Sequence, residues 1–179
     1  MSYDKLNEKI MDMQDEIIKA VQGCVQIDSV KAAPEEGAPY GKGCRAALDY
    51  ALKLGESLGF KTGNVGNRVG YVEFGEGDEM VGVLGHLDVV PVGEGWTYPL
   101  GAEIHDGKLY GRGVQDDKGP TIGAIYGLKA IRDLACRSTA VSVSFSVLMR
   151  RTVLPAFVII SRTAESFRLW ASPPMAIIR

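Results

Sequence analysis

The chain has 179 residues, enough to bury the core of a single domain, so size alone does not exclude a small complete enzyme. Its formal charge is −2 at pH 7 and it has no run of Lys and Arg, so composition predicts neither nucleic-acid nor membrane binding. The start is acidic and amphipathic rather than a secretory signal, and apolar runs such as Val153 to Ile160 are too short to span a bilayer. We therefore expect a cytoplasmic protein with small or neutral partners.

Two amphipathic helices are predicted first. Apolar residues recur at steps of three and four from Leu6 to Val21, which predicts a helix over roughly residues 3–23. The same pattern from Cys44 to Leu58 predicts a second helix, and Gly59 stands where a left-handed C-terminal cap belongs.

Short strands and a further helix follow. Val69 to Phe74 and Met80 to Leu84 are predicted strands, and the second is apolar throughout, as in a central strand covered on both faces. Lys108 to Tyr110 is a third extended piece, and Pro120 lies in the first turn of a helix running to about Leu134. Helices alternating with strands predict an α/β sandwich.

A histidine and an aspartate follow the strand that begins at Met80. His86 and Asp88 are two residues apart, so in extended chain they point the same way, at the strand end where α/β sheets assemble sites. Asp88 can then hold the ring nitrogen that does not bind metal. The alternative interpretation is a capped strand end with a hydrogen-bonded histidine.

The second motif is GRGVQDDKGP, residues 111–120, which places two acids in a glycine-rich turn before a helix. Such a turn lets carboxylates approach a cation closely. The glycines could equally serve a tight strand-to-helix connection, with Asp117 as the helix N-cap.

Together, HLDVVP (residues 86–91) and GRGVQDDKGP resemble the aminoacylase, desuccinylase and carnosinase-like branch of the two-zinc exopeptidases, and look most like its PepV-type dipeptidases. The resemblance runs over residues 1–134. It implies that His86 is a ligand of one zinc, that Asp88 is a catalytic residue that orients His86, and that Asp116 bridges both metals. It also implies a cis peptide between Asp116 and Asp117, and zinc as the cofactor, with cobalt or manganese as alternatives.

Other residues are interpreted as structural. Trp96 and Tyr98 are expected to pack their loop rather than touch substrate, and His105 to lie at the surface. Arg112 and Lys118 are expected to be partners of nearby carboxylates. The widely spaced cysteines give neither a disulfide framework nor a zinc site, and we interpret them as buried or incidental thiols (Cys24, Cys44 and Cys136).

The composition changes near Leu134. All 22 glycines precede that residue, whereas residues 135–179 contain six Arg, one Glu and no Lys, Asp, Asn, Gln, His or Tyr. The sequence therefore predicts a metallopeptidase part, residues 1–134, and an aberrant tail, residues 135–179. The apolar run from Val141 to Leu148 is a candidate substitute strand, for which no register is predicted.

The tail contains a trace of a different reading frame. A shifted codon takes the third base of one tail codon and the first two bases of the next. Read in this frame, the possible codons of residues 135–151 can encode the sequence LPVDRRIRFIFGTDEE. The resemblance implies that a GTDEE strand end supplies the glutamate general base and a further ligand, and the chain as written has no match for it. We interpret the tail as translation after a frameshift close to Leu134, natural or a sequencing error.

The predicted parent activity is metal-dependent hydrolysis of a dipeptide or small peptide, with no nucleic-acid or membrane partner. The present chain is expected to be a truncated, inactive α/β fold, a partial α/β/α sandwich without its later strands and its lid domain. One alternative is an N-acyl amino acid deacylase or desuccinylase of the same fold. An alternative of another class is a non-enzymatic metal-binding fragment.

Overall fold

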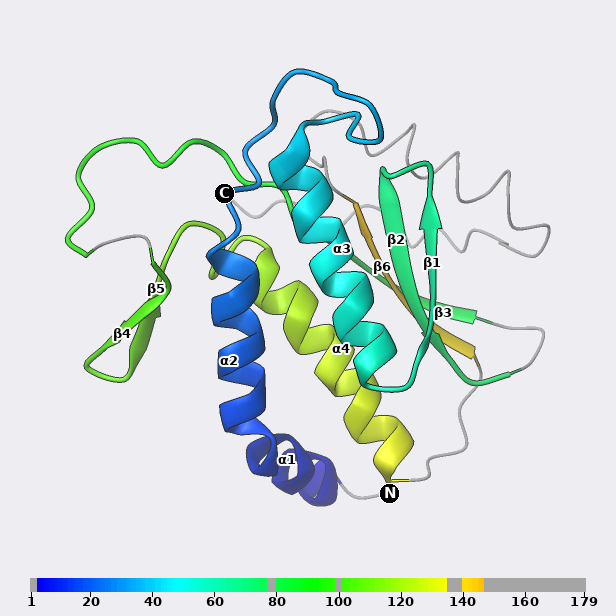
Figure 1. Ribbon diagram of the computed structural model, residues 1–179. Coiled ribbons are helices and arrows are strands. Elements are labelled where there is room, and N and C mark those ends of the chain that lie inside the picture. Colours follow the sequence, from blue (N-terminus) through cyan, green and yellow to red (C-terminus); the bar gives the residue numbers. More distant parts are fainter. Residues whose placement is uncertain (1–2, 77–79, 99–100, 135–139, 147–179) are drawn as a thin grey trace, which may run out of the picture.

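The computed structural model describes residues 3–76, 80–98 and 101–134, together with the backbone of 140–146. The helices are α1 (Tyr3–Asp12), α2 (Gln14–Val25), α3 (Lys42–Ser57) and α4 (Lys118–Asp133). The strands are β1 (Lys61–Val65), β2 (Val69–Phe74), β3 (Met80–His86), β4 (Glu103–His105), β5 (Lys108–Tyr110) and β6 (Ala140–Ser146). In Figure 1 the helices stand together on one side of the main sheet, and the β4–β5 hairpin lies apart from that sheet. The predicted mixture of helices and strands is confirmed.

The helix predicted over residues 3–23 is two helices, so this prediction was wrong in its continuity. Met13 separates α1 from α2 with backbone angles outside the helical region, φ −97° and ψ 6°. Its N–H donates to the Ile10 carbonyl oxygen at 3.1 Å, a tighter turn than the α-helix makes. The Met13 side chain is buried in the core, so the predicted apolar stripe survives while α1 turns away from the axis of α2 (Figure 1).

Helix α3 ends as its sequence predicts. Gly59 has a φ of +81°, and its N–H donates to the Glu56 carbonyl oxygen at 2.9 Å, while Phe60 N–H donates to the Gly55 carbonyl oxygen at 3.0 Å. This pair of bonds is the Schellman motif, which ends a helix by satisfying two of its last carbonyls.

The main sheet runs in the order β1-β2-β6-β3 over the described residues. Strand β6 pairs antiparallel with β2 and parallel with β3, aligning Val143 with Val72 and with Val83. The candidate strand from Val141 to Leu148 is therefore confirmed for 141–146, and its last two residues lie outside the described part. Its place between β2 and β3 had no basis in local sequence.

The prediction that the Met80–Leu84 strand is central and covered on both faces was wrong. Strand β3 stands at the end of the described strand order, and Val81 and Val83 are 56% and 41% exposed. An all-apolar strand is typical of a sheet that is covered on both faces. The described residues do not cover both faces of β3.

The helices build the core between themselves and the sheet. Helix α3 packs on β1 and β2, α4 packs on β3 and β6, and α2 packs against both α3 and α4. Leu48, Ile122 and Ile125 are fully buried where these layers meet. No helix of the described residues is long and apolar enough to cross a membrane.

Candidate metal centre

The segment that follows β3 is fixed by the loop after α2. Ser29 Oγ donates to the Leu87 carbonyl oxygen at 2.6 Å, and Val89 N–H donates to the Ser29 carbonyl oxygen at 3.2 Å. The Leu87 side chain is fully buried. These contacts anchor the residue between His86 and Asp88, so both polar side chains emerge from a rigid base. Ser29 was not singled out from the sequence, because nothing local connects it to residue 87.

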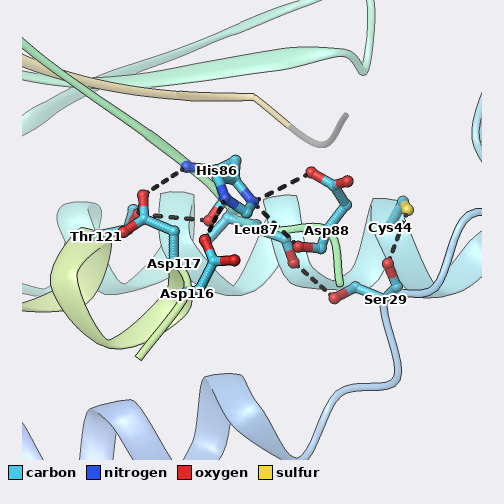
Figure 2. Close-up of polar contacts among 8 residues, drawn as sticks. All are labelled: Ser29, Cys44, His86, Leu87, Asp88, Asp116, Asp117 and Thr121. Carbon is cyan, nitrogen blue, oxygen red and sulfur yellow. Dashed lines mark hydrogen bonds and ion pairs between the residues drawn. The ribbon is translucent and has the colours of Figure 1, made fainter. Parts of the chain in front are cut away.

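His86 and Asp116 come together although they are 30 positions apart. His86 Nε2 lies 3.1 Å from Asp116 Oδ1, and Figure 2 shows the ring and the carboxylate facing each other. The His86 side chain is 15% exposed, whereas that of Asp116 is 71% exposed. Asp116 therefore presents a carboxylate to solvent beside a nearly buried imidazole.

Asp88 contacts the other ring nitrogen of His86. Nδ1 lies 3.1 Å from the Asp88 carbonyl oxygen and 3.4 Å from its carboxylate Oδ1. The hydrogen bond to Asp88 is the main cause that raises the pKa of His86 to about 9, and the bond to Asp116 adds to the rise, against the opposing effect of burial. The two acceptors on Nδ1 keep a proton there, so Nε2, which shares its own proton with Asp116, is the ring nitrogen that can give up its proton to bind a metal.

The peptide between Asp116 and Asp117 is cis, as the resemblance implies. Asp117 occupies the N-cap position of α4, but its carboxylate makes no capping bond to the helix. Instead Asp117 Oδ2 accepts the His86 backbone N–H at 3.1 Å and the Thr121 hydroxyl at 3.2 Å. The alternative interpretation of Asp117 as the helix N-cap is therefore confirmed for its position, whereas its side chain does not make the capping hydrogen bond.

The donor set fits part of a metal site. An imidazole nitrogen and a carboxylate oxygen are ligands that zinc accepts, whereas stable zinc sites take three or four protein ligands. Among residues 3–76, 80–98 and 101–134 no group of three or more His, Cys, Asp or Glu side chains gathers in metal-binding geometry. The described residues supply two convergent donors of such a site.

The expected carboxylate partners of Lys118 and Arg112 are not what these side chains contact. The Lys118 ammonium is fully buried and donates to the backbone oxygens of Cys24 and Ile27, at 3.1 and 2.6 Å. Arg112 Nη2 donates to the Val92 carbonyl oxygen at 2.7 Å, and its guanidinium lies over the Trp96 ring, 5.0 Å from the ring centre. Both cations connect backbone segments through the carbonyl oxygens to which they donate.

The aromatic residues after the His86 segment pack as predicted. Trp96 Nε1 donates to the Val92 carbonyl oxygen at 2.9 Å. Tyr98 stacks on His105 with ring centres 4.0 Å apart, and His105 Nε2 lies 2.9 Å from Glu103 Oε2. His105 is thus part of a small aromatic cluster on the β4–β5 hairpin, away from His86.

Two of the cysteines are buried thiols. Cys24 and Cys44 are free, and burial raises the pKa of each to about 11, so both stay protonated near neutral pH. The expectation of buried thiols is confirmed for these two, and Cys136 lies outside the described residues.

Similar proteins have the same sequence pattern and fold. Residues 82–147 match the family model "Peptidase family M20/M25/M40", a span that contains His86, Asp88 and Asp116. A protein of Bacillus subtilis (strain 168) named "Putative dipeptidase YtjP" is 43% identical over 129 residues, which are 70% of this chain and 28% of the relative. The chain therefore spans less than a third of that relative's length.

Two solved structures resemble the fold. Human carnosine dipeptidase 1 matches with a TM-score of 0.67 and 25% identity, over 80% of this chain and 34% of that one. The di-peptidase Dug1p from Saccharomyces cerevisiae matches with a TM-score of 0.75 and 20% identity, over 93% of this chain and 39% of that one. Residues 82–147 thus match the model of Peptidase family M20/M25/M40, and the chain is homologous to bacterial proteins that are named as putative dipeptidases.

Proposed function

We propose that this chain is the part of a dipeptidase-type hydrolase that contributes His86 and Asp116 to a metal centre, with zinc as the metal. One solved structure that this chain resembles is named as an M20 family metallo-carboxypeptidase. The observation that carries the proposal is the 3.1 Å approach of His86 Nε2 to Asp116 Oδ1 with Asp88 on the opposite ring nitrogen. A metal-ligating histidine usually donates its other ring N–H to a carboxylate or a backbone carbonyl, as His86 Nδ1 can donate to Asp88.

Each of the three residues has a distinct role in the proposed centre. Asp88 accepts the Nδ1 proton of His86, so Nε2 is the ring nitrogen whose lone pair would be available to a metal. Asp116 has two carboxylate oxygens on a largely exposed side chain, which suits a ligand shared by two cations. The bound metals would polarise the scissile carbonyl of a dipeptide and lower the pKa of a water molecule.

The 179-residue chain by itself is proposed to lack peptidase activity. Hydrolysis needs a general base that takes a proton from water. Three carboxylates near His86 have other roles here: Asp88 contacts Nδ1, Asp116 would be a metal ligand, and Asp117 accepts the His86 backbone N–H. Turnover of dipeptides by the purified, zinc-loaded chain, absent from a His86→Gln preparation, would overturn this proposal.

The ligand roles can be tested without activity, because the chain contains only two histidines. In the His105→Gln variant His86 is the one imidazole, so its ring nitrogens are assigned without ambiguity in a ¹⁵N NMR spectrum. Addition of zinc is expected to shift the Nε2 resonance and leave Nδ1 protonated. The same titration of Asp116→Asn should need about tenfold or more zinc, whereas an unchanged Nε2 resonance in the parent would remove His86 as a ligand.

The tail is proposed to be out-of-frame translation that begins close to Leu134. The family match extends to residue 147, and β6 places 140–146 inside the sheet. Both are compatible with a shifted frame, because shifted codons of an apolar strand often remain apolar. Resequencing the coding DNA over codons 125–180 tests the proposal: one added or missing base should restore GTDEE. If the reading frame is unaltered, residues 135–179 belong to the protein as encoded and the frameshift proposal is wrong.

A further inference from the structure

We propose that Asp117 and Thr121 position His86: Asp117 holds the His86 backbone N–H, and Thr121 holds Asp117 in place beside the His86 carbonyl oxygen. The significance for the metal centre rests on the proposed role of His86 as a ligand. Asp117 Oδ2 accepts the His86 N–H at 3.1 Å, and Thr121 Oγ lies 3.4 Å from the His86 carbonyl oxygen. Figure 2 shows both side chains reaching from the start of α4 to the end of β3. Neither was predicted to have this role.

We call Asp117 and Thr121 together the clamp, because their side chains contact the His86 backbone. The Thr121 hydroxyl links the two residues of this clamp. It lies 3.2 Å from Asp117 Oδ2 and 3.4 Å from the His86 carbonyl oxygen, so its one proton can serve either acceptor. The Asp117 carboxylate oxygen is the nearer of the two acceptors, and a carboxylate is a stronger acceptor than a backbone carbonyl. The hydroxyl therefore fixes the rotamer of Asp117, and Asp117 in turn fixes the His86 N–H.

The clamp is rigid because it belongs to the helix start. Thr121 is 3% exposed, and its backbone N–H donates to the Asp117 carbonyl oxygen at 2.9 Å. Asp117 and Thr121 are thus joined through both backbone and side chain within one turn of α4. A carboxylate that could have capped its own helix is directed to the neighbouring strand instead.

Gly85 gives independent support for the clamp. A Cβ added at Gly85 would lie 2.3 Å from Thr121 Oγ and 3.0 Å from Asp117 Oδ2. The residue before His86 must therefore lack a side chain if both clamp groups are to reach the backbone. The backbone of Gly85 itself does not need glycine, since its φ is not in the left-handed region.

The imidazole ring and the backbone of His86 are held by different residues. Asp88 and Asp116 contact the imidazole, whereas Asp117 and Thr121 hold the main chain from which the ring extends. Strand β3 is the last strand in the described sheet order, so it has a neighbouring strand, β6, on one side only. Helix α4, which packs on β3, carries the side chains that hold the His86 backbone. Removal of the hydroxyl should leave the fold intact and loosen the position of His86.

The first test uses the metal-free chain. Thr121→Val keeps the side-chain shape and removes the hydroxyl, while Thr121→Ser keeps the hydroxyl. Amide hydrogen exchange at His86 is expected to be about tenfold faster in Thr121→Val and near the parent rate in Thr121→Ser. Ile125→Val, a change in the fully buried core one turn along α4, controls for general loss of stability and should not speed exchange at His86 selectively. An unchanged His86 rate in a folded Thr121→Val chain would overturn the clamp.

The second test uses zinc alone. The apparent zinc affinity at the His86 ring is expected to fall about tenfold in Thr121→Val and to recover in Thr121→Ser. A change of this size is typical when a residue that orients a metal-ligating side chain is removed. Gly85→Ala should have the same effect with the hydroxyl still present. If the parent ring does not respond to zinc, the proposed function fails, while the exchange experiment still decides the clamp. If the parent binds zinc and Thr121→Val binds it equally well, the positioning role is excluded.

Discussion

The Lys118 ammonium lies 2.6 Å from the carbonyl oxygen of Ile27, and its side chain is completely buried. Its second acceptor, the Cys24 carbonyl oxygen, belongs to the last turn of α2. Lys118 thus connects the first residue of α4 to the end of α2, next to the Asp116 loop. Burial is the main cause that lowers the pKa of Lys118, and the two carbonyl oxygens take the place of solvent around its ammonium group.

Replacement of Lys118 by Met should destabilise the chain by about 2–3 kcal/mol, because two buried carbonyl oxygens lose a charged donor while the apolar stem is kept. Urea unfolding followed by circular dichroism measures the change. Lys53→Met, on the exposed surface of α3, is the matched control and should change stability by less than about 0.5 kcal/mol. Equal midpoints for the parent and Lys118→Met would show that the buried bonds contribute nothing.

Two glycines of α4 should respond to alanine in opposite ways. A Cβ at Gly119 would lie 2.0 Å from the Val114 carbonyl oxygen, so Gly119→Ala must displace backbone next to the Asp116 loop. Gly123 has nothing within 4 Å of an added Cβ, so Gly123→Ala should stabilise the helix by up to about 1 kcal/mol. Thermal unfolding of both variants is the measurement. A Gly119→Ala chain as stable as Gly123→Ala would contradict the close approach of Gly119 to the Val114 carbonyl oxygen.

The parts of this fold that local sequence could predict are those that local patterns determine. The Val69–Phe74 strand and the cap at Gly59 follow from β-branched runs and from a glycine after an apolar repeat. The break at Met13 carries no Gly or Pro signal, since the apolar repeat continues through it. The exposed position of β3 depends on which strands are present, and no pattern inside Met80–Leu84 reports that.

The site shows the same division. His86 and Asp116 stand in recognisable motifs, so their approach could be predicted before any coordinates. Ser29 and Thr121 are ordinary residues in their own segments, and their importance arises only from contacts 58 and 35 positions away. One signal was present in the sequence: Thr121 follows Asp117 by four residues, the spacing of neighbours on one helix face.

A charge on the exposed face of β3 should improve the behaviour of the chain in solution. Val81 is 56% exposed on an apolar strand at the end of the described order, the type of strand that pairs with other chains. Val81→Lys is expected to reduce light scattering on concentration with a stability change under about 0.5 kcal/mol. Val72→Lys, which introduces the same charge at a fully buried position of β2, should unfold the chain. If Val81→Lys also unfolds the chain, β3 is covered and not exposed.

Asp133 should give the chain a specific loss of stability in acid. Its carboxylate lies 2.6 Å from Lys129 Nζ, 3.2 Å from Lys9 Nζ and 3.0 Å from Arg132 Nη2, so it joins α1 to α4. The hydrogen bond to Lys129 is the main cause that lowers the pKa of Asp133 from 3.8 to about 2. A lowered folded-state pKa means that the stabilisation is fully present above about pH 4 and is lost as the pH falls toward 2.

Asp133→Asn is therefore expected to cost about 1 kcal/mol at pH 7, less than the full shift implies because the carboxylate is partly exposed and screened. The difference from the parent should narrow below pH 4, since protonation removes the same charge from the parent. Urea midpoints at pH 7, 5, 4 and 3 measure this convergence. Asp12→Asn, the same charge change at an exposed position of α1, controls for net charge and should remain close to the parent throughout. If the cost of Asp133→Asn were constant from pH 7 to 3, the contribution of Asp133 would come from packing and not from its charge.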